Sequence, residues 1–70
     1  MSKVVTGEYA SVDAARNAVD ELVNAGFPRE QVLREADSAT VKVMTPAASE
    51  AEVREILERH EPKAIHEHTA

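Results

Sequence analysis

Two segments of helical periodicity, each ended by glycine or proline, limit the folds that this chain can adopt. The first, SVDAARNAVDELVN, begins at Ser11, a residue type whose hydroxyl caps helix N-termini. Gly26 supplies a left-handed residue just past the helix, and Pro28 prevents its continuation. The pattern predicts an amphipathic helix over residues 11–25, with a core face of Val12, Ala15, Val19, Leu22 and Val23.

The second helical segment is TPAASEAEVREILERHEP, which Pro62 stops. Its start is open between two alternatives, because Thr45-Pro46 suits a first helical turn and Ser49 to Glu52 suits a capping box. The apolar stripe of this helix comprises Val53, Ile56 and Leu57.

Strand-type patterns fill the remaining segments, and turn-forming residues separate the second run from the third. The order β-α-β-β-α-β predicts one α+β domain over residues 1–70 with a ferredoxin-like fold. Two right-handed crossovers place both helices on one face of a four-stranded antiparallel sheet. The sequence leaves open whether Val32 or Leu33 points inward. The predicted strands are residues 3–9, 31–36, 39–45 and 63–68.

Such a fold leaves one face of the sheet without helices, and we expect any functional surface to lie there. Side chains alternate between the two faces of a strand, so inward Val41 and Val43 leave their neighbours on the uncovered side. A buried Ile65 has the same effect in the last strand. The predicted interaction face comprises Thr40, Lys42, Met44, Ala64 and His66, with His68 and, if Val5 is inward, Val4.

Composition excludes several classes of function. Thirteen Asp and Glu against eight Lys and Arg give a formal net charge of −5, which repels nucleic-acid phosphates. The absence of cysteine excludes disulfides, thiol chemistry and zinc–thiolate sites. The apolar pair Val4-Val5 is too short for a signal-peptide core or a membrane span, so we expect a cytoplasmic protein without membrane contact.

No catalytic or cofactor-binding pattern is present in the sequence. The residues that could act as nucleophiles, Ser11, Thr45 and Ser49, stand where helix caps are expected, and no G-x-S-x-G motif occurs. The acidic residues of the second helix lie mostly on its polar side, beside arginines at pairing distance. Gly7 and Gly26 are the only glycines, which rules out a phosphate-binding loop. We therefore expect neither an enzyme nor a bound cofactor.

The sequence AIHEH near the end of the chain raises the alternative of a metal site. His66 and His68 project from the same face of a strand, and His60 could add a third donor if the connection folds back. Zinc takes three protein ligands in catalytic sites and four in structural ones. The competing interpretation is a solvated terminal strand that carries two histidines.

Most of the chain resembles the small bacterial heat-induced or general stress protein domains. The resemblance is carried by VVTGEYASVDAARNAVDELVNAGFPREQV, with its AGFP turn, and by ATVKVMTP, EAEVREILERHEP and AIHEH. It implies a small cytoplasmic accessory domain and transfers no catalytic residue to this sequence.

These observations lead to two hypotheses about function. The first is a non-enzymatic domain that acts through the uncovered sheet face, as a homodimer or with another protein, in a stress-related setting. The second is a metal or small-ligand sensor that uses His66 and His68 on the same face.

Overall fold

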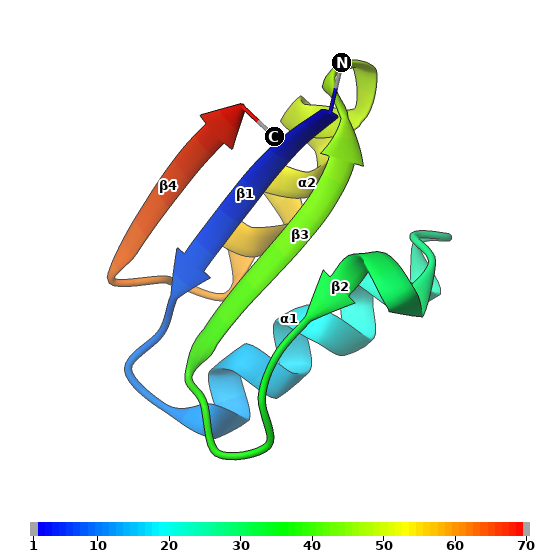
Figure 1. The fold of residues 1–70 in the computed structure, drawn as a ribbon. Helices are drawn as coiled ribbons and strands as arrows, with labels where there is room; N and C mark the ends of the chain where they lie inside the picture. Colours follow the sequence, from blue (N-terminus) through cyan, green and yellow to red (C-terminus); the bar gives the residue numbers. More distant parts are fainter. Residues whose placement is uncertain (1, 70) are drawn as a thin grey trace.

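The computed structural model describes residues 2–69 and confirms the ferredoxin-like α+β fold. Within that range the strands form one antiparallel sheet in the order β2-β3-β1-β4, and α1 and α2 lie on the same side of it (Figure 1). No helix in the described range is long and apolar enough to cross a membrane. The elements are β1 (Ser2–Glu8), α1 (Val12–Asn24), β2 (Val32–Leu33), β3 (Thr40–Pro46), α2 (Glu50–Arg59) and β4 (Ala64–Thr69), with 3₁₀ turns at Arg29–Gln31 and Ala47–Ser49.

The first helix starts as predicted. Ser11 has an extended backbone, and its Oγ accepts a hydrogen bond from the Ala14 amide at 3.1 Å. Ala18 belongs to the buried face of α1, which the sequence analysis had not included. The fully buried residues of α1 are small except for Leu22, so the helix packs close to the sheet.

The second helix starts at Glu50, after the 3₁₀ turn, and the predicted capping box does not form. Ser49 has φ −103° and ψ 2°, whereas a side-chain cap needs an extended N-cap residue. The other end agrees with the prediction, because α2 stops at Arg59, before Pro62.

The register of the sheet decides which side chains face the helices. Val5 of β1 is paired with Val43 of β3 and with Glu67 of β4, so these three residues share one face. Val5 and Val43 are fully buried under the helices. The buried core comprises Val5, Tyr9, Ala15, Ala18, Leu22, Val32, Val41, Val43, Val53, Ile56 and Leu57.

Strand β2 is much shorter than the predicted residues 31–36. After Leu33 the chain turns into a loop in which Arg34 Nη1 shares its two hydrogens among the carbonyls of Glu35, Ala36 and Ser38, at 2.9, 3.1 and 3.0 Å. These carbonyls are satisfied inside the loop and need no strand partner. Val32, paired with Val43, is the inward residue, and Leu33 points outward. This settles the choice that the sequence left open.

Candidate interaction surface

The side of the sheet away from the helices is here called the open face. Pairing places Thr6 of β1 between Lys42 of β3 and His66 of β4, and Leu33 of β2 opposite Lys42. Because side chains two apart on a strand share a face, the pairs on either side of this row complete the surface. The open face comprises Leu33, Thr40, Lys42, Met44, Pro46, Ser2, Val4, Thr6, Glu8, Ala64, His66 and His68.

The open face carries the two large apolar side chains that are exposed in residues 2–69. Leu33 is 46% exposed and Met44 is 43% exposed. Leu33 lies across from Lys42, and Met44 lies across from Val4, which is partly buried. The apolar surface therefore extends over β2, β3 and β1.

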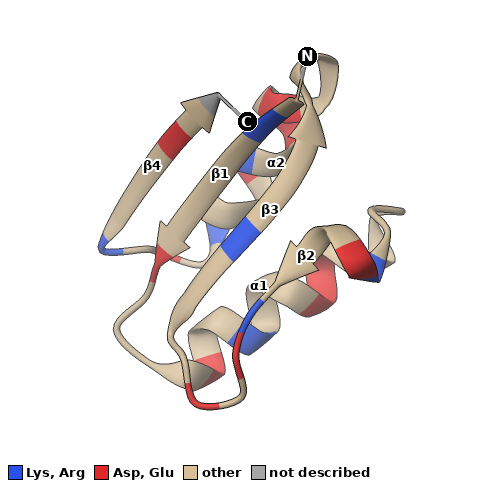
Figure 2. Cartoon of the chain, in the orientation of Figure 1, with Lys and Arg blue, Asp and Glu red and all other residues tan. Residues whose placement is uncertain are grey.

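Charge is sparse on this side of the molecule, because charged positions are concentrated on the helices and loops (Figure 2). His66 Nε2 lies 2.7 Å from Glu8 Oε2, which links β4 to β1. Lys42 has no ion-pair partner among the described residues. An unpaired ammonium thus stands between two exposed apolar side chains.

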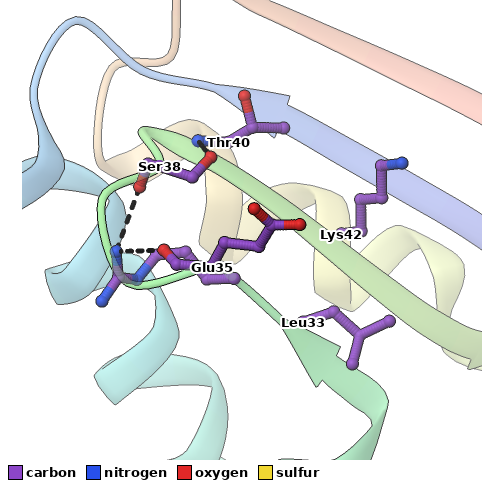
Figure 3. A pocket seen from close by; sticks show the side chains of 6 residues that line it. Leu33, Glu35, Ser38, Thr40 and Lys42 are labelled. Atoms are coloured by element: carbon purple, nitrogen blue, oxygen red, sulfur yellow. Dashed lines mark hydrogen bonds between the residues drawn. The ribbon is translucent and has the colours of Figure 1, made fainter.

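A hollow of about 620 Å³ opens at the β2 side of the open face. The loop between β2 and β3 lines one side of this hollow. Within the loop, Ser38 Oγ accepts a hydrogen bond from the Thr40 amide at 3.0 Å (Figure 3). Leu33 and Lys42 border it from two neighbouring strands. The lining residues are Leu33, Arg34, Glu35, Ser38, Thr40 and Lys42.

The predicted interaction residues Thr40, Lys42, Met44, Ala64 and His66 all lie on the open face, as does His68. What binds there, and whether His66 and His68 hold a metal, stay predictions. The proposal of His60 as a third donor is wrong. The end of α2 packs against α1, and His60 Nε2 lies 2.8 Å from Glu21 Oε1. No group of three or more metal-ligating side chains comes together in residues 2–69.

Sequence reasoning missed several members of this surface, namely Leu33, Glu8, Thr6, Ser2 and Pro46. Glu8 alternates with Thr6 and Val4, so the period of two was a sufficient signal. Leu33 carried no such signal, because the apolar pair Val32-Leu33 fits either orientation.

Acidic residues also gather on the helix side of the sheet. Glu67 points toward α2 and forms an ion pair with Arg54. The neighbouring Glu67 carboxylate, together with partial burial, raises the pKa of Glu50 above its ordinary value. One oxygen of Glu50 is buried without a hydrogen-bond partner in the described range. This cluster is separated from the open face by the sheet.

Comparison with known proteins adds no relative, since no protein-family model, curated protein or solved structure matches this chain.

Proposed function

We propose that this domain acts by protein association through the open face, without catalysing a reaction. One observation carries the proposal: the two exposed large apolar side chains, Leu33 and Met44, lie together on the face that no helix covers. Exposed apolar side chains gathered on one face are a feature of protein interaction sites.

The energy available from covering this face is modest but sufficient for a reversible complex. Full burial of a Leu or Met side chain stabilises by about 1.5–3 kcal/mol, so half-exposed Leu33 and Met44 contribute about 1 kcal/mol each. Thr40 and Ala64 on the same face are partly exposed, whereas Thr6 is only 8% exposed. Because a micromolar Kd corresponds to about −8.2 kcal/mol and a millimolar one to about −4.1 kcal/mol, we expect weak association near millimolar concentration, strengthened by complementary charge.

The cellular setting that we propose is a cytoplasmic, stress-related one. Its support is the resemblance of the sequence to heat-induced and general stress protein domains. No catalytic role is included, because the proposal rests on an apolar surface and requires no reacting group.

The substitution Met44→Glu tests the proposal. A carboxylate at this position would be desolvated in any complex that covers the open face, so we expect association to weaken about tenfold or more. The fold should survive, because Met44 is 43% exposed. Ala51→Glu is the matched control, since Ala51 is exposed on α2. Sedimentation equilibrium measures self-association, and cross-linking in cell extract measures association with other proteins.

Equal association of the Met44→Glu and Ala51→Glu variants would contradict the proposal. The sensor alternative has its own readout on the same samples, a zinc or nickel titration followed by amide NMR. Chemical-shift changes that centre on His66 and His68 and vanish in the His66→Ala, His68→Ala double variant would support metal binding in place of association as the function of this face. The exposure of both imidazoles on one face is the observation that favours this second candidate.

A further inference from the structure

We infer that the partner of the open face is a second copy of this chain, related by a twofold axis that runs parallel to the strands between β1 and β3. This inference rests on the proposed function and adds the identity of the partner and the geometry of the complex. It follows from the register of the sheet and from the placement of its charges.

Within residues 2–69 the open face is an ordered array of four rows across the strands, the outermost of which holds only Ser2 and Pro46. The middle row follows the strand order β2-β3-β1-β4, and the rows on either side lack a paired β2 residue. The middle row is Leu33, Lys42, Thr6 and His66; one flanking row is Met44, Val4 and His68, and the other is Thr40, Glu8 and Ala64.

A twofold axis along the strands keeps each row at its own level and exchanges the columns. Strand β3 then lies over β1 of the other copy, so Met44 covers the partner subunit's Val4. Lys42 lies over the partner subunit's Thr6 and one row away from the partner subunit's Glu8. The unpaired ammonium thus approaches a carboxylate, which also lies 2.7 Å from His66 Nε2 of its own chain, and the most exposed apolar side chain of β3 gains an apolar contact.

Three other twofold axes bring like charges together. An axis across the strands, through the middle row, stacks Lys42 on the partner's Lys42 and Val4 on the partner's Glu8. An axis along β3 also opposes the two lysines, and an axis along β1 opposes the two copies of Glu8. Like charges that face each other in an interface are strongly unfavourable. Of these four axes, only the one between β1 and β3 brings Lys42 near a carboxylate of the partner without opposing like charges.

The outer columns fit the same arrangement. The hollow beside β2 lies under the partner's β4, so the partner's His66 covers Leu33 and approaches Glu35, which lines that hollow. The β2 edge of one copy, with its hollow, thus meets the β4 edge of the other copy, which carries two imidazoles. Aligned sheets cross at about −30°, which preserves the contacts nearest the axis, those between β1 and β3.

The size of the surface indicates a weak dimer. Four strands about 4.8 Å apart, up to seven residues long at about 3.3 Å per residue, present roughly 350 Å² in projection on each copy. Because side chains make the surface uneven, its accessible area is larger than its projection. The total area buried on both copies therefore approaches the roughly 1,000 Å² at which specific interfaces begin. Association should therefore be reversible and sensitive to a single charge.

A charge exchange between two variants tests the geometry. Lys42→Glu places a carboxylate near the partner's Glu8 twice per dimer, and Glu8→Lys places an ammonium near the partner's Lys42 twice. Each variant should dimerise about tenfold or more weakly than the wild type. In a mixed dimer of the two variants, one contact joins the introduced Glu to the introduced Lys, and the other joins the native Lys42 to the native Glu8. Both contacts therefore bring opposite charges together. The mixture should regain affinity to within about threefold of the wild type.

The controls separate contact charge from total charge. Lys63→Glu changes the net charge as Lys42→Glu does, and Glu30→Lys as Glu8→Lys does, at exposed positions outside the open face. Their mixture should show no preference for the mixed dimer. Sedimentation equilibrium measures affinity, and native mass spectrometry with one variant ¹⁵N-labelled measures the mixed fraction.

Selective mixed dimers of Lys42→Glu with Glu8→Lys, absent in the control pair, support the inference. A wild-type dimer whose variants show no such selectivity overturns this geometry and leaves association through the open face intact. A wild-type chain that stays monomeric at millimolar concentration overturns self-association, and the extract cross-linking above then decides whether association with other proteins survives.

Discussion

Tyr9 connects β1 to α2 through a single buried hydrogen bond. Its hydroxyl donates to the Leu57 carbonyl at 2.8 Å, and the side chain is 3% exposed. Gly7 makes room for the ring, because a Cβ at that position would lie 3.1 Å from the Tyr9 ring. Burial raises the pKa of the Tyr9 phenol to about 12. The residue therefore holds a proton that the unfolded chain releases more readily.

The substitution Tyr9→Phe should lower the free energy of unfolding by about 1 kcal/mol, since it removes a buried hydrogen bond and leaves the Leu57 carbonyl with only the His60 amide, at 3.3 Å. In the wild type, the unfolded phenol ionises near pH 10 and the folded one near 12. Unfolding thus releases a proton between these values, and about 2–3 kcal/mol of stability is lost as pH rises from 10 to 12.

Urea unfolding monitored by circular dichroism at pH 8, 10 and 11 measures both effects. The Tyr9→Phe variant should not lose stability in this way at high pH. The free energies of unfolding of the two chains should therefore approach each other as pH rises from 8 to 11. A parallel decline of both would contradict the assignment to Tyr9.

At the level of whole elements, a polar cluster joins the two helices. Glu21 of α1 pairs with Arg59 and His60 at the end of α2. The hydrogen bond with His60, aided by the positive charge of Arg59, lowers the pKa of Glu21 below its ordinary value. Ionised Glu21 is therefore favoured in the folded state.

The substitution Glu21→Gln should remove a contribution that exists above the ordinary glutamate pKa and disappears as pH falls through the lowered one. The wild type should be the more stable chain at pH 6, and the difference should shrink toward pH 3. Thermal unfolding across this range measures the effect. The control is Glu30→Gln, in the exposed turn before β2. Its stability should change with pH in the same way as that of the wild type. A Glu21→Gln curve parallel to the wild type would contradict the role of this cluster.

For the molecule as a whole, stability depends on a small core. Leu22 is fully buried, and its replacement by alanine should cost about 2.7–5 kcal/mol. A chain of 70 residues has a total stability of roughly 3.5–10 kcal/mol. The Leu22→Ala variant should therefore have a measurable unfolded population at 37 °C.

The matched control for this prediction is Leu33→Ala, because Leu33 is 46% exposed on the open face. It should cost less than about 1 kcal/mol in urea unfolding while weakening association. Similar losses of stability in both variants would contradict the separation between core and interaction surface.

Local patterns in the sequence were sufficient for the order of elements, the first helix cap and the inward side of β3, whereas the inward side of β1 stayed conditional until the structure buried Val5. Those features depend on residues within one or two turns of each other, and the periods of 2 and 3.6 report them directly. The same alternation placed Lys42, Met44 and His66 on one face before any contact was known.

Contacts between distant segments were outside the reach of such patterns. The outward turn of Leu33 depends on pairing with β3, and the position of His60 on Glu21 in the other helix. The proximity of Glu8 and His66 is likewise a product of the β1–β4 pairing. Periodicity along a chain specifies which side of its own element a residue faces. The neighbours of that residue in other strands and helices are determined only when the elements pack together, because packing maximises burial over the whole chain.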